Sequence, residues 1–266
     1  MLRVIFNRKG GVGKSSITCN LAAVSAQQGQ RTLVVDLDPQ GNSTHYLLGK
    51  PSADLRDTIA TFFDQTLNFS FDKKQIADLV YKTPFSNLDL LPSSPLLGDL
   101  EHKLESRYKI YKLRDALESL SGSYDRIFID TPPALNFYTR SALIATDSCL
   151  IPFDCDAFSV EAMYFIMEAI QEIKEDHNQK LHIEGIIANH YHAQARHPRA
   201  LIASLIEEGL PILPVYLTTS VKMRESHQLC KPVVYAFPNH KLSKLFGELY
   251  QVLDTSKQAL TELESY

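Results

Sequence analysis

The chain has 266 residues, of which 44% are hydrophobic and 22% charged, proportions typical of a globular protein with one large α/β domain or two small ones. Its formal net charge of −4 excludes a uniformly basic nucleic-acid binder, so any contact with DNA must come from a local patch or from two subunits together. No apolar run approaches the ~18 residues of a membrane-spanning helix, and the four cysteines form no Cys-x-x-Cys pair, which favours reduced thiols over a disulfide framework.

The first predicted unit is a strand, a glycine-rich loop and a helix. Leu2 to Asn7 is a short apolar strand without a basic and apolar leader before it, so we expect no signal peptide. Ser15 to Gln28 has the apolar spacing of a helix, and Gly29 is its expected stop. This is the context that a phosphate-binding loop requires, because glycines let backbone N–H groups approach phosphates and the helix N-terminus favours anions.

The loop reads Arg-Lys-Gly-Gly-Val-Gly-Lys-Ser-Ser over residues 8–16, which is nearly a Walker A phosphate loop. Arg8 replaces the glycine expected six positions before Lys14, and a second lysine, Lys9, precedes the glycines. We expect Lys14 to reach the β- and γ-phosphates and the Ser15 hydroxyl to bind Mg²⁺. Lys9 can instead meet the phosphates of a nucleotide in a facing subunit, which predicts a nucleotide-dependent dimer. The predicted nucleotide contacts are Lys9, Gly10, Gly11, Val12, Gly13, Lys14, Ser15 and Ser16.

The next predicted strand, Arg31 to Asp38, ends in acid and is followed by Pro39 and Gly41, which favour a turn. Ligands of parallel sheets bind outside the carboxyl ends of the strands. We therefore expect Asp38 to face the phosphate loop, where it can orient the attacking water or support the Mg²⁺ shell. The alternative is a solvated turn aspartate.

Strands and helices alternate along the rest of the chain. Residues 51–86 are mixed and mainly helical. The further expected strands are Asn87 to Pro92, Tyr124 to Asp130, Ser148 to Phe153, Ile183 to Ala188 and Ile212 to Leu217, with a brief extended piece at Val233 to Phe237. The expected helices are Leu96 to Leu120, Phe158 to Ile173, Pro198 to Glu208 and about His240 to Leu263. The alternation predicts an α/β fold with a doubly wound, mostly parallel sheet and helices on both faces, as one domain over residues 1–266.

Asp130 ends the apolar strand Ile127-Phe128-Ile129-Asp130 and precedes Thr131-Pro132-Pro133. An apolar strand that ends in aspartate is the Walker B arrangement, whose carboxylate holds Mg²⁺ directly or through water. The alternative is a strand-end aspartate that caps a turn.

Together, the segments Lys9 to Ser16, Asp36 to Asn42 and Asp130 to Pro133 resemble the deviant Walker A ATPases of the ParA/MinD class. The similarity is greatest to ParA/Soj partition ATPases without an N-terminal DNA-binding extension. The resemblance implies that Lys9 acts across an ATP-bound homodimer. It also implies that Asp38 positions water and that Asn189, at the end of Ile186 to Asn189, contacts adenine.

The resemblance further implies non-specific binding to double-stranded DNA, with Lys222 and Arg224 where such ATPases carry DNA-contacting residues. It implies a cargo-associated activator protein of ParB-like role and a cytoplasmic, nucleoid-associated location. Two positions depart from the family. Arg8 replaces a common glutamine, and Thr218-Thr219 replaces Pro-Arg in a loop that serves adenine and DNA binding.

Two other functions compete. A membrane-bound, MinD-like regulator needs a basic amphipathic C-terminal helix, whereas Thr255 to Tyr266 contains Glu262 and Glu264 and a single basic residue, Lys257. We therefore expect no membrane association. A metabolic P-loop enzyme, such as an iron–sulfur reductase or an amide-forming ligase, is the other alternative. The reductase is disfavoured because residues 131–144 contain no cysteine.

Overall fold

A computed structural model describes residues 1–68, 73–155, 157–192 and 194–264. Its centre is a seven-stranded sheet with the strand order β3-β4-β2-β5-β1-β6-β7. Strand β3 is antiparallel to β4, and every other pairing is parallel. The strands are β1 (Leu2–Ile5), β2 (Thr32–Asp36), β3 (Tyr81–Lys82), β4 (Leu88–Leu91), β5 (Arg126–Asp130), β6 (Ser148–Asp154) and β7 (His182–Asn189). The predicted doubly wound, mostly parallel fold is confirmed.

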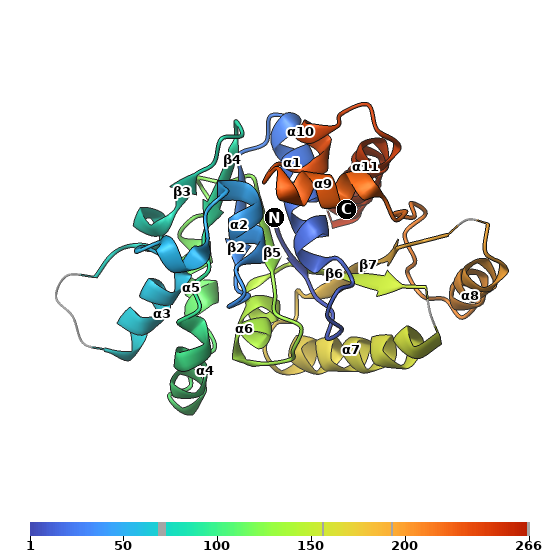
Figure 1. The fold of residues 1–266 in the computed structure, drawn as a ribbon. Helices are drawn as coiled ribbons and strands as arrows, with labels where there is room; N and C mark the ends of the chain where they lie inside the picture. Colours follow the sequence, from blue (N-terminus) through green and yellow to red (C-terminus); the bar gives the residue numbers. More distant parts are fainter. Residues whose placement is uncertain (69–72, 156, 193, 265–266) are drawn as a thin grey trace.

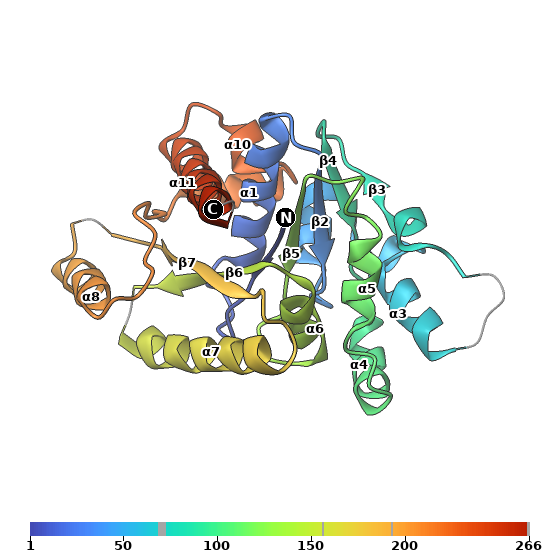
Figure 2. The same ribbon diagram turned by 180° about the vertical axis from the view of Figure 1, so that it is seen from behind.

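Helices cover both faces of the sheet (Figures 1 and 2). One face packs against α1 (Lys14–Gln27), α2 (Asn42–Leu48), α10 (Val233–Ala236) and α11 (Lys241–Glu264). The other face packs against α3 (Ile59–Leu67), α4 (Leu97–Ser106), α5 (Lys112–Glu118), α6 (Phe137–Ala145) and α7 (Ala157–Asp176). The remaining helices are α8 (Arg196–Glu207), α9 (Val221–Gln228) and the 3₁₀ turns Ser52–Asp54 and Ile76–Leu79.

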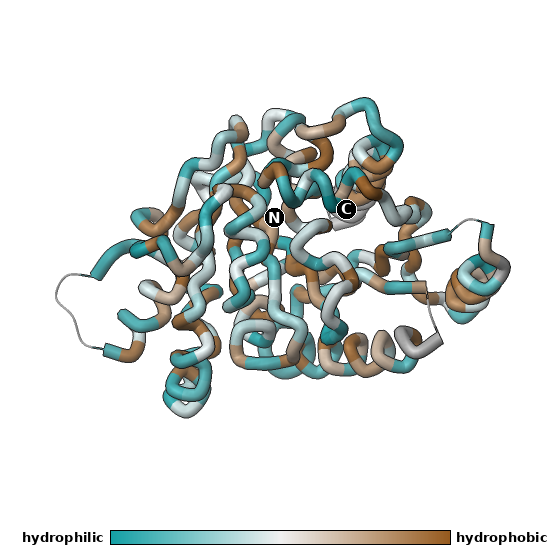
Figure 3. The backbone as a smooth tube through the Cα atoms, viewed as in Figure 1, coloured by the Kyte–Doolittle hydropathy of each residue, from teal (hydrophilic) through white to brown (hydrophobic). Residues whose placement is uncertain are grey.

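The strands supply both hydrophobic cores because successive side chains of a strand point to opposite faces. In β2, Leu33 and Val35 belong to the core beneath α3 to α7, whereas Val34 belongs to the core beneath α1 and α11. Burial on both faces explains why these strands read as continuous apolar runs in the sequence. Along α7 and α8 hydrophobic and hydrophilic stretches alternate (Figure 3), as expected of helices with one face on a core.

Three predicted elements are wrong. Leu96 to Leu120 is not one helix, because Tyr108 adopts a left-handed backbone conformation (φ 54°) between α4 and α5. Ile212 to Leu217 runs beside β7 with a single bridge from Ile212 to Ile186 and forms no strand. Pro214, which lacks an N–H group, interrupts the ladder there.

Val233 to Phe237 is not extended, since Val233–Ala236 forms the helical turn α10. Pro232 precedes this turn, and its carbonyl oxygen accepts hydrogen bonds from the N–H groups of Tyr235 and Ala236, both at 2.9 Å. Buried valines at positions 233 and 234 therefore reflect packing on α1 and α11, not strand formation.

No helix within the described part of the chain combines the length and the apolar character that crossing a membrane requires.

Candidate nucleotide-binding site

The glycine-rich loop joins β1 to α1 at the carboxyl edge of the sheet. Gly11 and Gly13 have left-handed backbone conformations, with φ of 79° and 89°. A Cβ atom on Gly13 would lie 2.5 Å from Nδ2 of Asn189, so this position has no room for a side chain. The first helical hydrogen bond runs from Ile17 N to Gly13 O at 2.8 Å. The N–H groups of the first turn of α1 therefore lack carbonyl partners within the helix and form an anion-binding site.

Two hollows adjoin the loop. The Lys14 hollow, about 460 Å³, is lined by Gly10, Lys14, Ser15, Asp38 and Asn42, among others. The Asn189 hollow, about 230 Å³, is lined by Ile17, Asn189, Thr218, Thr219 and Arg224, among others. Gly11, Gly13, Ser16 and His227 line both hollows. The loop thus lies between a charged compartment and a more enclosed one, as a polyphosphate joined to a nucleoside requires.

Lys14 is the buried cation of the site, with 7% of its surface exposed. Its Nζ donates to the carbonyl oxygen of Lys9 at 3.1 Å. Burial lowers the pKa of Lys14, and the charges of Asp130 and Asp38 oppose that shift. Lys14 is therefore fixed at the loop beside two carboxylates that favour its charged form, and its contact with phosphate stays a prediction.

Asp130 is fully buried at the end of β5. Its Oδ2 accepts a hydrogen bond from Ser43 Oγ at 2.7 Å, and its Oδ1 has no hydrogen-bond partner among the described residues. Burial raises the pKa of Asp130 to about 6, and the neighbouring Ser15 and Ser43 hydroxyls oppose the rise. A buried carboxylate oxygen without a partner, beside a serine hydroxyl, fits the oxygen ligands that Mg²⁺ prefers. The residues present therefore fit a Mg²⁺–nucleotide complex.

Asp38 lies across the Lys14 hollow from the loop, with 6% of its surface exposed. Its Oδ1 accepts a hydrogen bond from Gln40 N at 2.9 Å, which fixes the turn after β2. The structure thus brings Asp38, Lys14 and Asp130 together at one edge of the sheet, as the sequence predicted.

Asn189 ends β7 and is 8% exposed. Its Nδ2 donates to the carbonyl oxygen of Val12 at 2.9 Å, which ties β7 to the phosphate loop. Asn189, Thr218 and Thr219 line one hollow. The predicted adenine contact is thus placed on the side of the loop away from Asp38, and its role stays a prediction.

Lys9 is on the rim of the site. Its Nζ lies 3.3 Å from Oδ2 of Asp154, and its side chain is 40% exposed. The same carboxylate faces Nδ1 of His190 at 2.8 Å. Burial acts to raise the pKa of Asp154, but His190 and Lys9 together hold it below its ordinary value.

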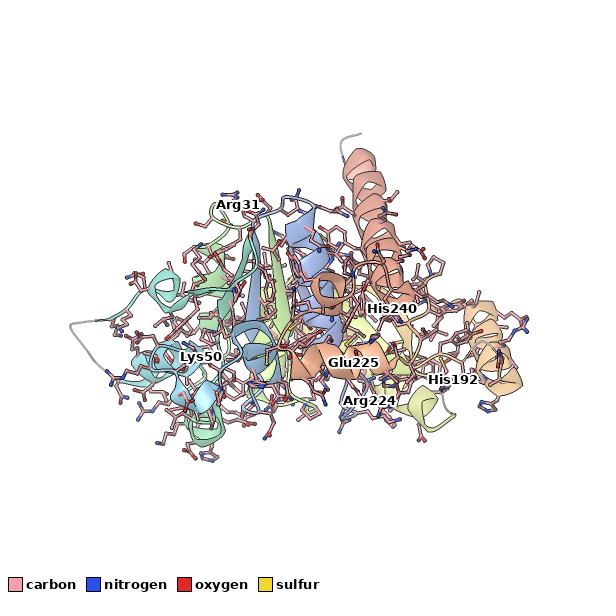
Figure 4. All side chains as sticks on the ribbon, turned by 45° about the horizontal axis from the view of Figure 1, so that its top comes forward. Arg31, Lys50, His192, Arg224, Glu225 and His240 are labelled. Carbon is pink, nitrogen blue, oxygen red and sulfur yellow. The ribbon has the colours of Figure 1, made fainter. Side chains whose placement is uncertain are left out.

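The two predicted DNA contacts lie on α9, beside the nucleotide hollows. Nζ of Lys222 is 2.6 Å from Oε2 of Glu225 and 4.7 Å from the ring centre of Phe237. Arg224 is exposed and lines the Asn189 hollow. Figure 4 labels Arg224 and Glu225 on α9. Their contact with DNA stays a prediction.

Sequence reasoning missed three residues of this site: Ser43, Asp154 and His227. Asp154 directly follows a predicted apolar strand, which is the signal that identified Asp38 and Asp130. Ser43 follows the turn that contains Asp38, and its place in the site could be predicted only if helix α2 were predicted first. His227 comes from a helix 211 positions away from Ser16 in the chain, and no local pattern marks it.

The chain matches the family model of the AAA domain (AAA_31) over residues 2–183. It is 34% identical to the chromosome partitioning protein ParA of Myxococcus xanthus over 86% of this chain and 79% of that protein. It is 31% identical to the sporulation initiation inhibitor protein Soj of Bacillus subtilis over 92% of this chain and 95% of that protein.

Among solved structures, cobyrinic acid a,c-diamide synthase from Mycobacterium smegmatis, with bound ADP and magnesium, is similar at a TM-score of 0.76. It shares 25% identity over 86% of this chain and 92% of that chain. Fold likeness thus extends to a diamide synthase, whereas a chromosome partitioning protein is among the relatives above 30% identity. With the loop lysines and strand-end aspartates in place, the chain belongs to the ParA/MinD class of P-loop ATPases.

Proposed function

We propose that residues 1–266 act as one ATPase domain that binds Mg²⁺–ATP, dimerises around it and positions a cargo on DNA. The ATP-bound dimer binds double-stranded DNA without sequence preference, and a cargo-associated activator protein stimulates hydrolysis and release. The cargo is a plasmid, a chromosome region or a large protein assembly. The function places the protein on the nucleoid in the cytoplasm.

The observation that carries this proposal is the different setting of the two loop lysines. Lys14 is 7% exposed and faces its own loop, so it serves the nucleotide of its own subunit. Lys9 has a side chain 40% exposed at the rim, from which a lysine can reach the phosphates of a facing subunit. A second cation at that place adds to phosphate binding chiefly when another subunit closes on the site.

The hydrolytic chemistry follows from the same edge of the sheet. Ser15 and Asp130 would hold Mg²⁺, which supplies neutralising charge to the β- and γ-phosphates. Asp38, fixed by Gln40 N, is in place to orient a water molecule toward the terminal phosphate. Since hydrolysis needs a water positioned by Asp38 and a partner protein to complete the site, we expect the intrinsic reaction to be slow.

The two alternatives lack a supporting observation of this kind. The amide-forming enzyme shares the fold, and a fold does not by itself carry a function. The membrane alternative is disfavoured by the acidic C-terminal segment that the sequence predicts. The last residues of that segment, 265–266, lie outside the described residues.

The test is retention on non-specific double-stranded DNA with ATP, with ADP and without nucleotide, for wild type and Lys9→Ala. We expect retention with ATP alone, and its loss in Lys9→Ala. Nucleotide binding by Lys9→Ala, measured separately, is the control for an intact site. Absence of retention in every state, in wild-type protein that binds ATP, would overturn the proposal and favour a metabolic or membrane role.

A further inference from the structure

Among the described residues, His227 is the one from outside the phosphate loop that lines both the Lys14 hollow and the Asn189 hollow. It comes from α9, and its Nε2 lies 3.0 Å from the hydroxyl of Ser16 on α1. The contact joins two helices across the mouth of the site. The proposed phosphate, Mg²⁺, adenine and DNA contacts do not include this imidazole.

The ring is held in place by aromatic packing. It lies edge-on to the ring of Tyr46, with centroids 4.5 Å apart and an interplanar angle of 87°. The Tyr46 hydroxyl is fixed by Ser226 Oγ at 2.8 Å and by Asn20 Nδ2 at 3.3 Å. The contacts with Tyr46 and Ser16 together orient Nε2 toward the loop.

The partner of that nitrogen lies where an anion binds. Ser16 is in the first turn of α1, whose N–H groups lack carbonyl partners within the helix. Ser16 also lies between the Lys14 side, where the terminal phosphates are expected, and the Asn189 side, where the nucleoside is expected. A phosphate bound at Ser16 is therefore an inner one, shared by ADP and ATP.

We propose that His227 is a nucleotide ligand that donates a hydrogen bond from Nε2 to the phosphate oxygen bound at Ser16. It adds a residue from α9 to a site otherwise built by the loop and the strand ends. The proposal rests on the proposed function through nucleotide binding alone, and it requires neither DNA nor a cargo.

The charges around His227 give the contact a pH dependence. His227 is exposed as a residue, and the partial burial of its ring lowers its pKa. The titratable groups that line the two hollows with it are Lys14 from α1, His45 and Tyr46 from α2, Asp38 from the turn after β2, His190 directly after β7 and Arg224 from its own helix. A phosphate bound beside the ring favours its charged form. Nucleotide binding therefore raises the pKa of His227, and affinity rises as the pH falls through the range in which the bound imidazole protonates.

The experiment measures the Kd of Mg²⁺–ADP and of a non-hydrolysable ATP analogue by calorimetry between pH 8 and pH 6, for wild type and His227→Gln. Glutamine keeps a hydrogen-bond donor but cannot titrate. We expect wild type to gain about tenfold in affinity relative to His227→Gln over this range, the difference that a charge-assisted hydrogen bond makes. Because ADP and ATP share the inner phosphates, the gain should be equal for both nucleotides. Titration of the nucleotide itself cancels in the ratio.

His177→Gln is the matched control. His177 lines neither hollow, and its Nδ1 lies 2.8 Å from the hydroxyl of Tyr111. This variant should keep the wild-type pH dependence. A constant ratio of wild type to His227→Gln at all pH values, or the same loss in His177→Gln, would overturn the proposal. If the wild-type protein shows the pH effect but is not retained on DNA, His227 keeps its proposed role and the DNA-based function is overturned.

Discussion

At the scale of single residues, Lys9 has a partner within its own subunit that competes with the proposed contact across a dimer. Asp154 holds the Lys9 ammonium at 3.3 Å, and His190 shares the same carboxylate. The Lys9 side chain is 40% exposed and that of Asp154 19%, so solvent screens the pair and its strength is modest. Lys9 must leave Asp154 before it can reach a phosphate in a facing subunit.

Asp154→Asn should therefore favour the ATP-bound dimer. The amide still accepts a hydrogen bond from His190 but no longer attracts Lys9 by charge. Since a partly exposed ion pair contributes about 0.2–1 kcal/mol, the ATP concentration that gives half-maximal dimer should fall by roughly 1.4- to 5-fold. Light scattering across an ATP titration measures this. Asp57→Asn breaks the exposed Lys74–Asp57 pair and should leave the midpoint unchanged. A midpoint that rises in Asp154→Asn would show that Asp154 supports the dimer.

The residues of the site differ in how far the sequence could predict them. Lys14, Asp38 and Asp130 follow from local patterns, because the carboxyl ends of parallel strands meet at one edge. The ion pair between Lys9 and Asp154 could not be predicted, because it joins the loop to the end of β6, 145 positions later in the chain. The contact of His227 with Ser16 depends likewise on where α9 packs, which no spacing within the helix determines.

At the scale of elements, a buried hydrogen-bond network attaches α2 to the strands that carry the carboxylates. Thr44 Oγ1 donates to Asp36 Oδ2 at 2.7 Å and accepts from Ser93 N at 2.9 Å. All three residues are fully buried, and burial raises the pKa of Asp36 well above its ordinary value. Ser93 Oγ in turn donates to the carbonyl oxygen of Asp38. The network thus positions the turn that presents Asp38.

Thr44→Val keeps the shape of the side chain and removes this link. Asp36 loses one donor, and the N–H group of Ser93 is left without its acceptor. Leaving a buried polar group unpaired costs about 1–3 kcal/mol, so the free energy of unfolding should fall by roughly 2 kcal/mol in a urea titration. The control Thr255→Val removes a hydroxyl that bonds the carbonyl oxygen of Gln251 on the exposed side of α11, and should change stability by less than about 0.5 kcal/mol. Equal losses in the two variants would contradict a special role of the network.

The elements themselves were predictable where periodicity was strong. Helices α1, α7, α8 and α11 begin and end within a few residues of their predicted bounds. The break between α4 and α5 was not predictable, because the left-handed residue there is Tyr108 and not glycine. The segment 212–217 reads as a strand by composition, yet its proline leaves it beside β7 without a ladder.

At the scale of the whole molecule, a net charge of −4 means that DNA binding depends on where the cations lie. Lys222 is partly engaged by Glu225 and Phe237, and Arg224 lines the Asn189 hollow. Both lie on α9, which lines the Asn189 hollow through Arg224, and the proposed dimer presents each of them twice. The proposed function makes this paired surface the DNA contact, so its effect should depend on salt.

Combining Lys222→Ala with Arg224→Ala tests that surface. Because each phosphate contact contributes about −0.9 to the slope of log K against log salt, loss of up to two contacts per subunit should flatten the slope by roughly 2–4 and weaken retention. Since Arg224 lines the Asn189 hollow, DNA retention must be compared at equal ATP occupancy. Arg31→Ala with Lys82→Ala removes the same charge from pairs with Asp125 and Asp89, and Figure 4 shows Arg31 far from Arg224. If the two double variants lose DNA retention equally, the loss reflects the change in net charge. If the α9 variant alone loses it, the contact is local, and a protein of negative net charge binds DNA through the helix that also faces its nucleotide.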